Sequence, residues 1–277
     1  RPRPGTARVT PQVTPATVQA HFGREAAEGR RLLPDPTTVS GLGTFRKYEH
    51  AAALMADASV RDVIDVGCNR GSIESLFHER YAERARTTRV EGVDVSAEAI
   101  AQARALDLPS CTFQAYDGRR LPFADATFDL AIMVEVIEHV IDKRSVLHEV
   151  FRVLRPGGRF FITTPNPECV ALRVESSMWY VLRRLFRRRI PAKDAFIAAG
   201  ALDALLAEVG FVRADLEMVA VLHLFIKSWN WVVMSTGPPS MLCAYQRFCV
   251  SRLERSGLPA WLERRLHWTL ATELRKP

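Results

Sequence analysis

Between residues 62 and 117 the sequence alternates short apolar runs with amphipathic stretches, and an acidic side chain stands at or next to the end of each run. The acidic residues are Asp65, Asp94 and Asp117, and the runs are DVIDV at 62–66, RVEGVDV at 89–95 and CTFQAY at 111–116. Strand-like runs separated by helical spacing indicate successive β-α-β units, which place their strands in a parallel sheet. Because parallel strands end at one edge of the sheet, the three carboxylates are expected to lie there together.

The alternation continues beyond this region. A nearly continuous apolar run at 128–134 is typical of a strand buried on both faces, and a helix is expected from about 143 to 153. The Arg-Pro-Gly-Gly turn at 155–158 ends that helix, a fifth strand follows at 159–164, and a later helix at 198–209 ends at Gly210. The sequence therefore predicts an α/β fold with a doubly wound, mostly parallel sheet and helices on both faces.

The 277 residues fit one enlarged α/β domain with additions at its ends. We expect a mobile arm at 1–17, an N-terminal helical lid at 18–57 and the α/β domain at 58–277. Within that domain we expect an inserted cap at about 167–195 and a helical C-terminal extension at about 227–277.

The composition, 48% hydrophobic and 25% charged, is that of an ordinary globular protein. The five cysteines include no CxxC pair, so neither a disulfide framework nor a zinc site is indicated, and a cytoplasmic location is expected. No apolar run reaches the roughly 18 to 20 residues that a membrane-spanning helix needs.

The loop after the first strand reads Gly67-Cys-Asn-Arg-Gly71, and glycines at such a turn let the backbone approach a ligand closely. Asparagine tolerates the left-handed backbone that this turn needs at Asn69. Asp94 is placed to accept hydrogen bonds from a ribose diol, and Asp117 is placed for an adenine amino group. A dinucleotide-binding dehydrogenase is disfavoured, because the loop lacks the GxGxxG spacing that cradles a diphosphate.

Four segments in this order resemble the class I S-adenosylmethionine methyltransferases: VIDVGCNRG at 63–71, VEGVDVS at 90–96, LPFADATFDLAIMVEVIEHV at 121–140 and EVFRVLRPGGRFFITTPN at 149–166. The resemblance implies a Rossmann-like, seven-stranded sheet that binds S-adenosylmethionine and releases S-adenosylhomocysteine. It also implies that the glycine loop holds the methionine part, Asp94 the ribose and Asp117 the adenine. The expected cofactor contacts are Asp65, Gly67, Cys68, Asn69, Gly71, Asp94, Val95, Asp117, Gly118 and Val134.

The motifs are closest to those of ubiquinone-pathway O-methyltransferases. That branch uses an upstream arginine near the cofactor carboxylate, which would be Arg46 here. Glu135, Glu138 and His139 have i, i+3 and i+4 spacing, so a helix after the fourth strand would place them on one face. Three interpretations are open: a divalent-metal site, as the resemblance allows but we do not favour; a general base at His139 assisted by Glu135; or a pocket wall.

We expect O-methylation of a hydrophobic small molecule, such as a quinone precursor, isoprenoid or other natural product. The arginines between residues 183 and 189 would suit an acidic acceptor or peripheral contact with a membrane. The alternatives are an RNA 2′-O-methyltransferase and a non-catalytic, cofactor-binding scaffold. A nucleic-acid partner is disfavoured, because the RNA enzymes have a further histidine where this chain reads Lys193-Asp-Ala-Phe196.

Overall fold

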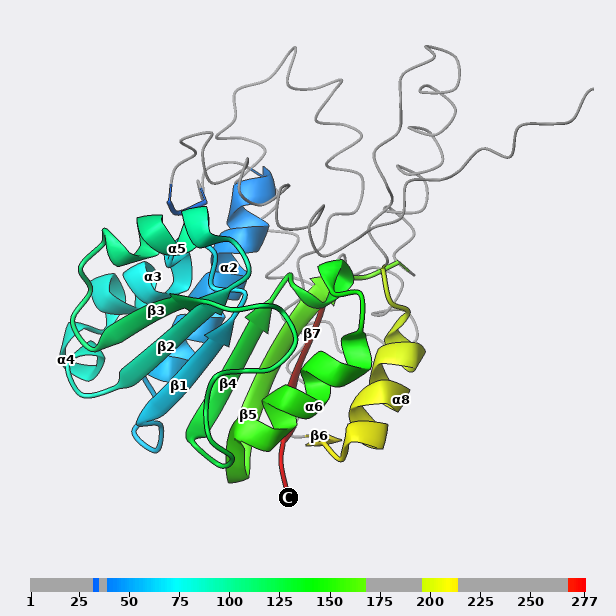
Figure 1. The fold of residues 1–277 in the computed structure, drawn as a ribbon. Helices are drawn as coiled ribbons and strands as arrows, with labels where there is room; N and C mark the ends of the chain where they lie inside the picture. Colours follow the sequence, from blue (N-terminus) through cyan, green and yellow to red (C-terminus); the bar gives the residue numbers. More distant parts are fainter. Residues whose placement is uncertain (1–31, 35–38, 168–195, 214–268) are drawn as a thin grey trace, which may run out of the picture.

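The computed structural model describes residues 32–34, 39–167, 196–213 and 269–277 of the chain, which are coloured in Figure 1. Their centre is a seven-stranded sheet with the strand order β3-β2-β1-β4-β5-β7-β6. Its strands are β1 Asp62–Val66, β2 Arg89–Asp94, β3 Cys111–Ala115, β4 Phe128–Val134, β5 Leu154–Pro165, β6 Val212–Arg213 and β7 Thr269–Arg275.

The first five strands pair in parallel, and β7 runs antiparallel to both β5 and β6. The chain therefore has the Rossmann-like, mostly parallel sheet that the sequence predicts. The order reverses between β1 and β4, and in open α/β sheets such a switch point opens a crevice beyond the carboxyl ends of the strands.

The predicted helical extension at 227–277 is wrong for its last part, because residues 269–275 form β7. The segment contains good helix formers, but β5 offers it a full edge, and seven residue pairs from Thr269 to Arg275 align with that edge. Tertiary pairing overrides local propensity here. Residues 227–268 lie outside the described part of the chain.

Helices cover both faces of the sheet (Figure 1). One core joins α6 Lys143–Val153 and α8 Ala199–Val209 to β1, β4 and β5. The other joins α2 Val39–Met55, α3 Ser72–Arg80 and α4 Ala82–Ala85 to the opposite face. Helix α5 Ala97–Arg104 packs against β2 and β3, and a short 3-10 turn, η1 Ile137–His139, follows β4.

The N-terminal region is represented by α2, which packs on the sheet through the fully buried Ala51, Ala52 and Met55. Most of the predicted lid, the arm at 1–17 and the cap from 168 to 195 lie outside the described residues. Among the described helices none has the length and apolar character required to cross a membrane.

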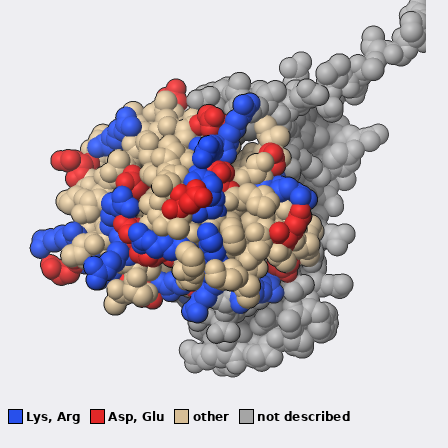
Figure 2. Space-filling view, turned by 60° about the horizontal axis from the view of Figure 1, so that its bottom comes forward, with Lys and Arg blue, Asp and Glu red and all other residues tan. Residues whose placement is uncertain are grey.

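Acidic and basic side chains are intermixed on the face that Figure 2 brings forward. The amino ends of β1, β2 and β4 supply part of this charge as ion pairs. Arg155 bridges Asp62 and Asp129 at 2.8 and 2.6 Å, and Arg89 also contacts Asp62 at 2.8 Å. Charges at this edge neutralise one another across neighbouring strands.

Candidate active site

A cavity of about 1260 Å³ lies at the carboxyl ends of β1, β2, β3 and β4. It begins at the loop after β1, passes the ends of β2 and β3, and continues past the end of β4 to the first turns of α6. The parallel sheet thus brings into one cavity the acidic residues that the sequence places at successive strand ends.

The glycine loop forms the start of this cavity. Gly67 and Asn69 have positive φ values of 84° and 49°, so the predicted left-handed conformation of the asparagine is confirmed. A β-carbon at Gly67 would lie 2.3 Å from Val136 Cγ2, which excludes any larger residue without a shift of that side chain. The Gly67 and Cys68 N–H groups donate to Val93 O at 2.7 and 3.1 Å, which ties the loop to β2.

Asp94 ends β2 and lines the cavity. Its Oδ2 accepts the Asn69 N–H at 2.9 Å, and its Oδ1 accepts the Ser96 N–H at 2.8 Å. Burial raises the pKa of this carboxyl, and hydrogen bonds from the backbone N–H groups of Ser96, Asn69 and Val95 oppose that rise. A carboxylate offers about four acceptor positions, so these bonds leave capacity for a ligand hydroxyl.

Asp117 lies at the next strand end, exposed to solvent in the cavity. The backbone N–H groups of Arg119 and Arg120 both donate to its Oδ1, at 2.9 and 3.4 Å. These bonds lower the pKa of Asp117, so it is ionised at neutral pH. Gly118 follows with φ 75° and also lines the cavity.

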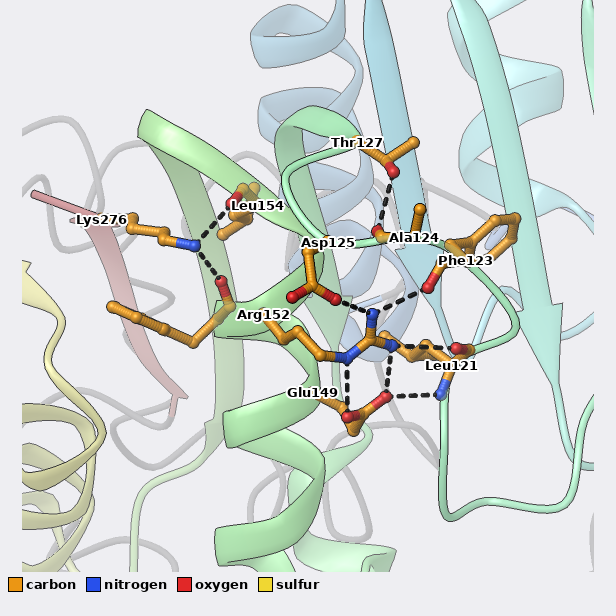
Figure 3. A network of polar contacts seen from close by, with 10 residues as sticks. Leu121, Phe123, Ala124, Asp125, Thr127, Glu149, Arg152, Leu154 and Lys276 are labelled. Carbon is orange, nitrogen blue, oxygen red and sulfur yellow. Dashed lines mark hydrogen bonds and ion pairs between the residues drawn. The ribbon is translucent and has the colours of Figure 1, made fainter.

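The loop that carries Asp117 is fixed to α6 by Arg152 and Glu149 (Figure 3). Arg152 donates to the carbonyls of Leu121 and Phe123 at 3.0 and 2.8 Å, and its guanidinium also binds Glu149. Glu149 in turn accepts the Leu121 N–H at 2.9 Å and lines the cavity. This network sets the position of the loop relative to the cavity.

The expected cofactor contacts divide into two groups. Arg46 and Gly71 do not line the cavity; Arg46 belongs to α2, and Gly71, with φ 76°, precedes α3. The others do line it, and they are Asp65, Gly67, Cys68, Asn69, Asp94, Val95, Asp117, Gly118 and Val134.

The predicted shared helix face for Glu135, Glu138 and His139 is wrong. Glu135 does not begin a helix; it has φ 57° and follows β4 directly. Glu138 is buried and accepts a hydrogen bond from Thr164 Oγ1 at 3.1 Å, so only Glu135 and His139 of the three line the cavity. The η1 turn buries Ile137 and Glu138, so Glu138 lies behind the cavity wall while its carboxylate stays close to the His139 ring.

Glu135 is held from two sides. Its Oε2 lies 3.2 Å from Lys47 Nζ of α2, and its Oε1 accepts the Thr163 hydroxyl at 3.0 Å. Lys47 is 6% exposed and also reaches Thr269 of β7 at 3.5 Å. This pairing of Glu135 with Lys47 was not predicted, because a lysine 88 residues earlier in the chain carries no local sign of it.

The carboxylate beside the His139 ring is Glu138, whose Oε1 lies 3.9 Å from His139 Nε2. Burial and the charge of Glu135 raise the pKa of Glu138 to about 7. No group of three or more His, Cys, Asp or Glu side chains among the described residues has the arrangement of a metal site. The metal interpretation of these three residues therefore has no support in the described part of the chain.

A second pair of acidic residues, Asp65 and Glu74, lies behind the glycine loop. Asp65 is 1% exposed and lines the cavity, and Glu74, from the first turn of α3, is 0% exposed. Burial raises the pKa of both, that of Glu74 to about 7. Glu74 was not among the predicted site residues. Its position among the apolar helix residues Ile73, Leu76 and Phe77 does, however, indicate a buried acid.

Tyr48 of α2 also lines the cavity. Burial, with the charges of Asp65 and Glu135, raises the pKa of its hydroxyl to about 12. The phenol is therefore a neutral donor at physiological pH.

Comparison with known proteins gives one domain match. Residues 64–162 match the family described as a methyltransferase domain. This range includes the glycine loop, Asp94, Asp117 and the residues after β4.

Two curated relatives show the extent of the similarity. A probable S-adenosylmethionine-dependent methyltransferase of Mycolicibacterium smegmatis is 36% identical over 139 residues, 48% of this chain and 51% of the relative. The ubiquinone/menaquinone biosynthesis C-methyltransferase UbiE of Desulfotalea psychrophila is 32% identical over 177 residues, 63% of this chain and 68% of the relative. The chain spans 51 to 64% of the length of the Mycolicibacterium protein and of two fungal relatives named O-methyltransferase. A further relative is named an N-methyltransferase.

Among solved structures, a Haloferax volcanii complex of the Trm112 methyltransferase activator with a methyltransferase aligns with a TM-score of 0.60. The alignment covers 94% of this chain and 97% of that chain at 20% identity, a likeness that shows the fold alone.

Proposed function

The chain belongs to the class I S-adenosylmethionine-dependent methyltransferases, and we propose that it transfers the cofactor methyl group to a hydroxyl of a hydrophobic small molecule. The observation that carries the proposal is one cavity in the described part of the chain, which joins three acidic strand ends to a wall that holds apolar side chains and His139.

The cavity suits the cofactor in charge and shape. Asp94 retains acceptor capacity for a ribose hydroxyl, and Asp117 presents a charged carboxylate near the next strand end. The glycine loop provides close backbone approach, and the acidic Asp65 lies beside it. A sulfonium with an α-ammonium group is a cationic ligand, and this end of the cavity is rich in carboxyls.

The acceptor side of the cavity lies beyond the end of β4. Val136, Val140 and Ile141 contribute apolar surface there, and Ile141 is 56% exposed. An apolar acceptor would cover these side chains and exclude water from the reacting atoms. His139 stands among them and is the group that we assign to removal of the acceptor proton.

When bound, S-adenosylmethionine supplies an electrophilic methyl group. Held by the glycine loop, Asp94 and Asp117, it would give this methyl group to the acceptor oxygen and leave as S-adenosylhomocysteine, with the electron pair of the carbon–sulfur bond on sulfur. His139 accepts the hydroxyl proton, while Glu138, 3.9 Å from the ring, stabilises the imidazolium. Lys47 and Thr163 fix Glu135 beside this site, so Glu135 acts as a positioned charge and not as the proton acceptor.

The test is to incubate the protein with methyl-labelled cofactor and extracts, with and without RNase. We expect label in an organic-soluble small molecule, unchanged by RNase. Label in RNA, or no transfer to any fraction, would overturn the acceptor proposal.

With the acceptor identified, His139→Gln should lower kcat by about 100-fold while the cofactor Kd changes little, because only proton removal is lost. His78→Gln is the matched control, since His78 lies against Cys111 and does not line the cavity. An unaltered kcat in His139→Gln would remove His139 from the chemistry.

A further inference from the structure

Three buried carboxyl oxygens lack a hydrogen-bond partner in the described part of the chain: Asp65 Oδ2 and both Glu74 oxygens. Asp65 comes from the end of β1, and Glu74 comes from the first turn of α3, so the glycine loop brings the two together. Two carboxylates cannot satisfy each other, because neither has a proton to donate. A proton between them supplies the missing donor.

The surroundings favour retention of that proton. The groups that face the pair include acids or neutral donors from three other elements: Tyr48 of α2, Asp94 of β2 and Cys68 of the glycine loop. Near Tyr48, Glu135 adds a further negative charge that is paired with Lys47, and Arg70 adds a positive charge. Burial is the largest influence on both carboxyls, and burial disfavours ionisation.

We propose that Glu74 is a positioning residue that acts through Asp65, so that the cavity takes up its cationic ligand in exchange for the proton that the two carboxyls share. Asp65 lines the cavity and Glu74 does not, so the ligand meets only Asp65. This inference rests on the proposed function, because it takes the α-ammonium group of the cofactor as the cation that approaches Asp65.

The proposed exchange predicts the direction in which ligand affinity changes with pH. A ligand whose binding releases a proton binds more tightly as pH rises, with at most about a tenfold gain per pH unit for one proton. Glutamine at position 74 retains an N–H donor toward Asp65 but removes the second acid. The variant loses the charge and the carboxyl hydrogen bond of Glu74 that help to raise the pKa of Asp65, so binding should release less proton than in the wild type.

The experiment is isothermal titration calorimetry with S-adenosylhomocysteine, which carries the α-ammonium group and transfers no methyl. Measurements at pH 6 to 8, in buffers of different ionisation enthalpy, give the number of protons released. We expect wild-type protein to release a large fraction of one proton per ligand at pH 7. We expect Glu74→Gln to release clearly less than wild type and to bind several-fold more tightly than wild type at pH 6.

Glu79→Gln is the matched control, since it makes the same change on the exposed side of α3 and should behave as wild type. Titration of the ligand amino group is common to all three proteins and cancels in the comparison. Wild-type binding without proton release would overturn the inference and leave the proposed function intact, even if Glu74→Gln failed to fold. Absence of S-adenosylhomocysteine binding at any pH would instead contradict the proposed function.

Discussion

Acidic side chains have opposite surroundings at the two edges of the sheet, and β1 shows this contrast within three residues. At its amino end, Asp62 is paired with Arg89 and Arg155, each at 2.8 Å. Near its carboxyl end, Asp65 is buried, and the group beside it is another acid, Glu74. The same residue type therefore joins strands at one edge and lines a cavity at the other.

Strand β4 repeats the contrast. Burial opposes ionisation of Asp129 at its amino end, but hydrogen bonds from Arg155 and from the backbone of residues 61 and 62 lower the pKa of Asp129 overall. At the other end, Glu135 follows β4 and is held by Lys47, a buried cation from α2. Acids at the amino edge are neutralised by exposed arginines, whereas those at the carboxyl edge line the cavity, and Glu135 there is held by a buried lysine and a buried hydroxyl.

The largest expected effect is on ligand binding at the carboxyl edge. Asp94→Ala removes the acceptors for the ribose diol and for the Asn69 N–H of the glycine loop. We expect S-adenosylhomocysteine to bind about 100-fold more weakly, since hydrogen bonds to a charged group contribute about 1.5 to 3 kcal/mol. Calorimetric titration measures the change.

Asp129→Ala is the counterpart at the amino edge. It removes acceptors of Arg155 and of two backbone N–H groups, so the variant should unfold at lower temperature while its Kd for S-adenosylhomocysteine stays at the wild-type value. If both variants lost affinity equally, the functional difference between the edges would not exist.

The fold was accessible from the sequence because it rests on local signals. Ser96 caps α5 through the Ala99 N–H at 3.2 Å, and the apolar run at 128–134 forms β4 with the predicted limits. Strand β7 was not accessible, because its conformation depends on the edge that β5 presents. Local composition contains no information about such an edge.

The difference between local sequence signals and tertiary contacts also decides which parts of the site could be predicted. Asp65, Asp94 and Asp117 could be placed together because strand ends are visible in the sequence and parallel strands share an edge. The arrangement of Glu135, Glu138 and His139 could not, because helical spacing was assumed where the chain turns through a positive φ of 57° at Glu135. The Lys47–Glu135 pair connects elements that only the folded chain brings together.

The second expected effect is on stability at the carboxyl edge. Lys47→Met leaves Glu135 without its cation, and Lys47 is buried, so we expect the free energy of unfolding to fall by about 2 kcal/mol. Chemical denaturation measures this change. Lys47→Arg should retain most of the stability, and Lys47→Met combined with Glu135→Gln should recover part of the loss. A double variant no more stable than Lys47→Met would show that charge pairing is not the cause.

The third expected effect is a pH dependence of stability that arises from Glu74, at the carboxyl edge. The raised pKa of Glu74, about 7, means that the folded protein binds more protons than the unfolded chain. Stability should therefore fall as pH rises from about 4.5 to about 7, by at most about 1.4 kcal/mol per pH unit for this group. Glu74→Gln should remove this part of the dependence and exceed wild-type stability at pH 8. Denaturation of the ligand-free proteins at pH 5, 6, 7 and 8 tests it, and parallel curves for the two proteins would contradict it.

The smallest expected effect is at the amino edge. Arg155→Met removes the cation between Asp62 and Asp129, but the arginine side chain is 39% exposed and Asp62 keeps its contact with Arg89. Solvent and salt screen such pairs, so we expect a loss of about 1 kcal/mol or less, reduced further in 1 M salt. Affinity for S-adenosylhomocysteine should not change, because Arg155, Asp62 and Asp129 lie at the amino edge and none of them is among the described residues that line the cavity. A loss as large as that of Lys47→Met, or one insensitive to salt, would mean that burial does not distinguish the charges of the two edges.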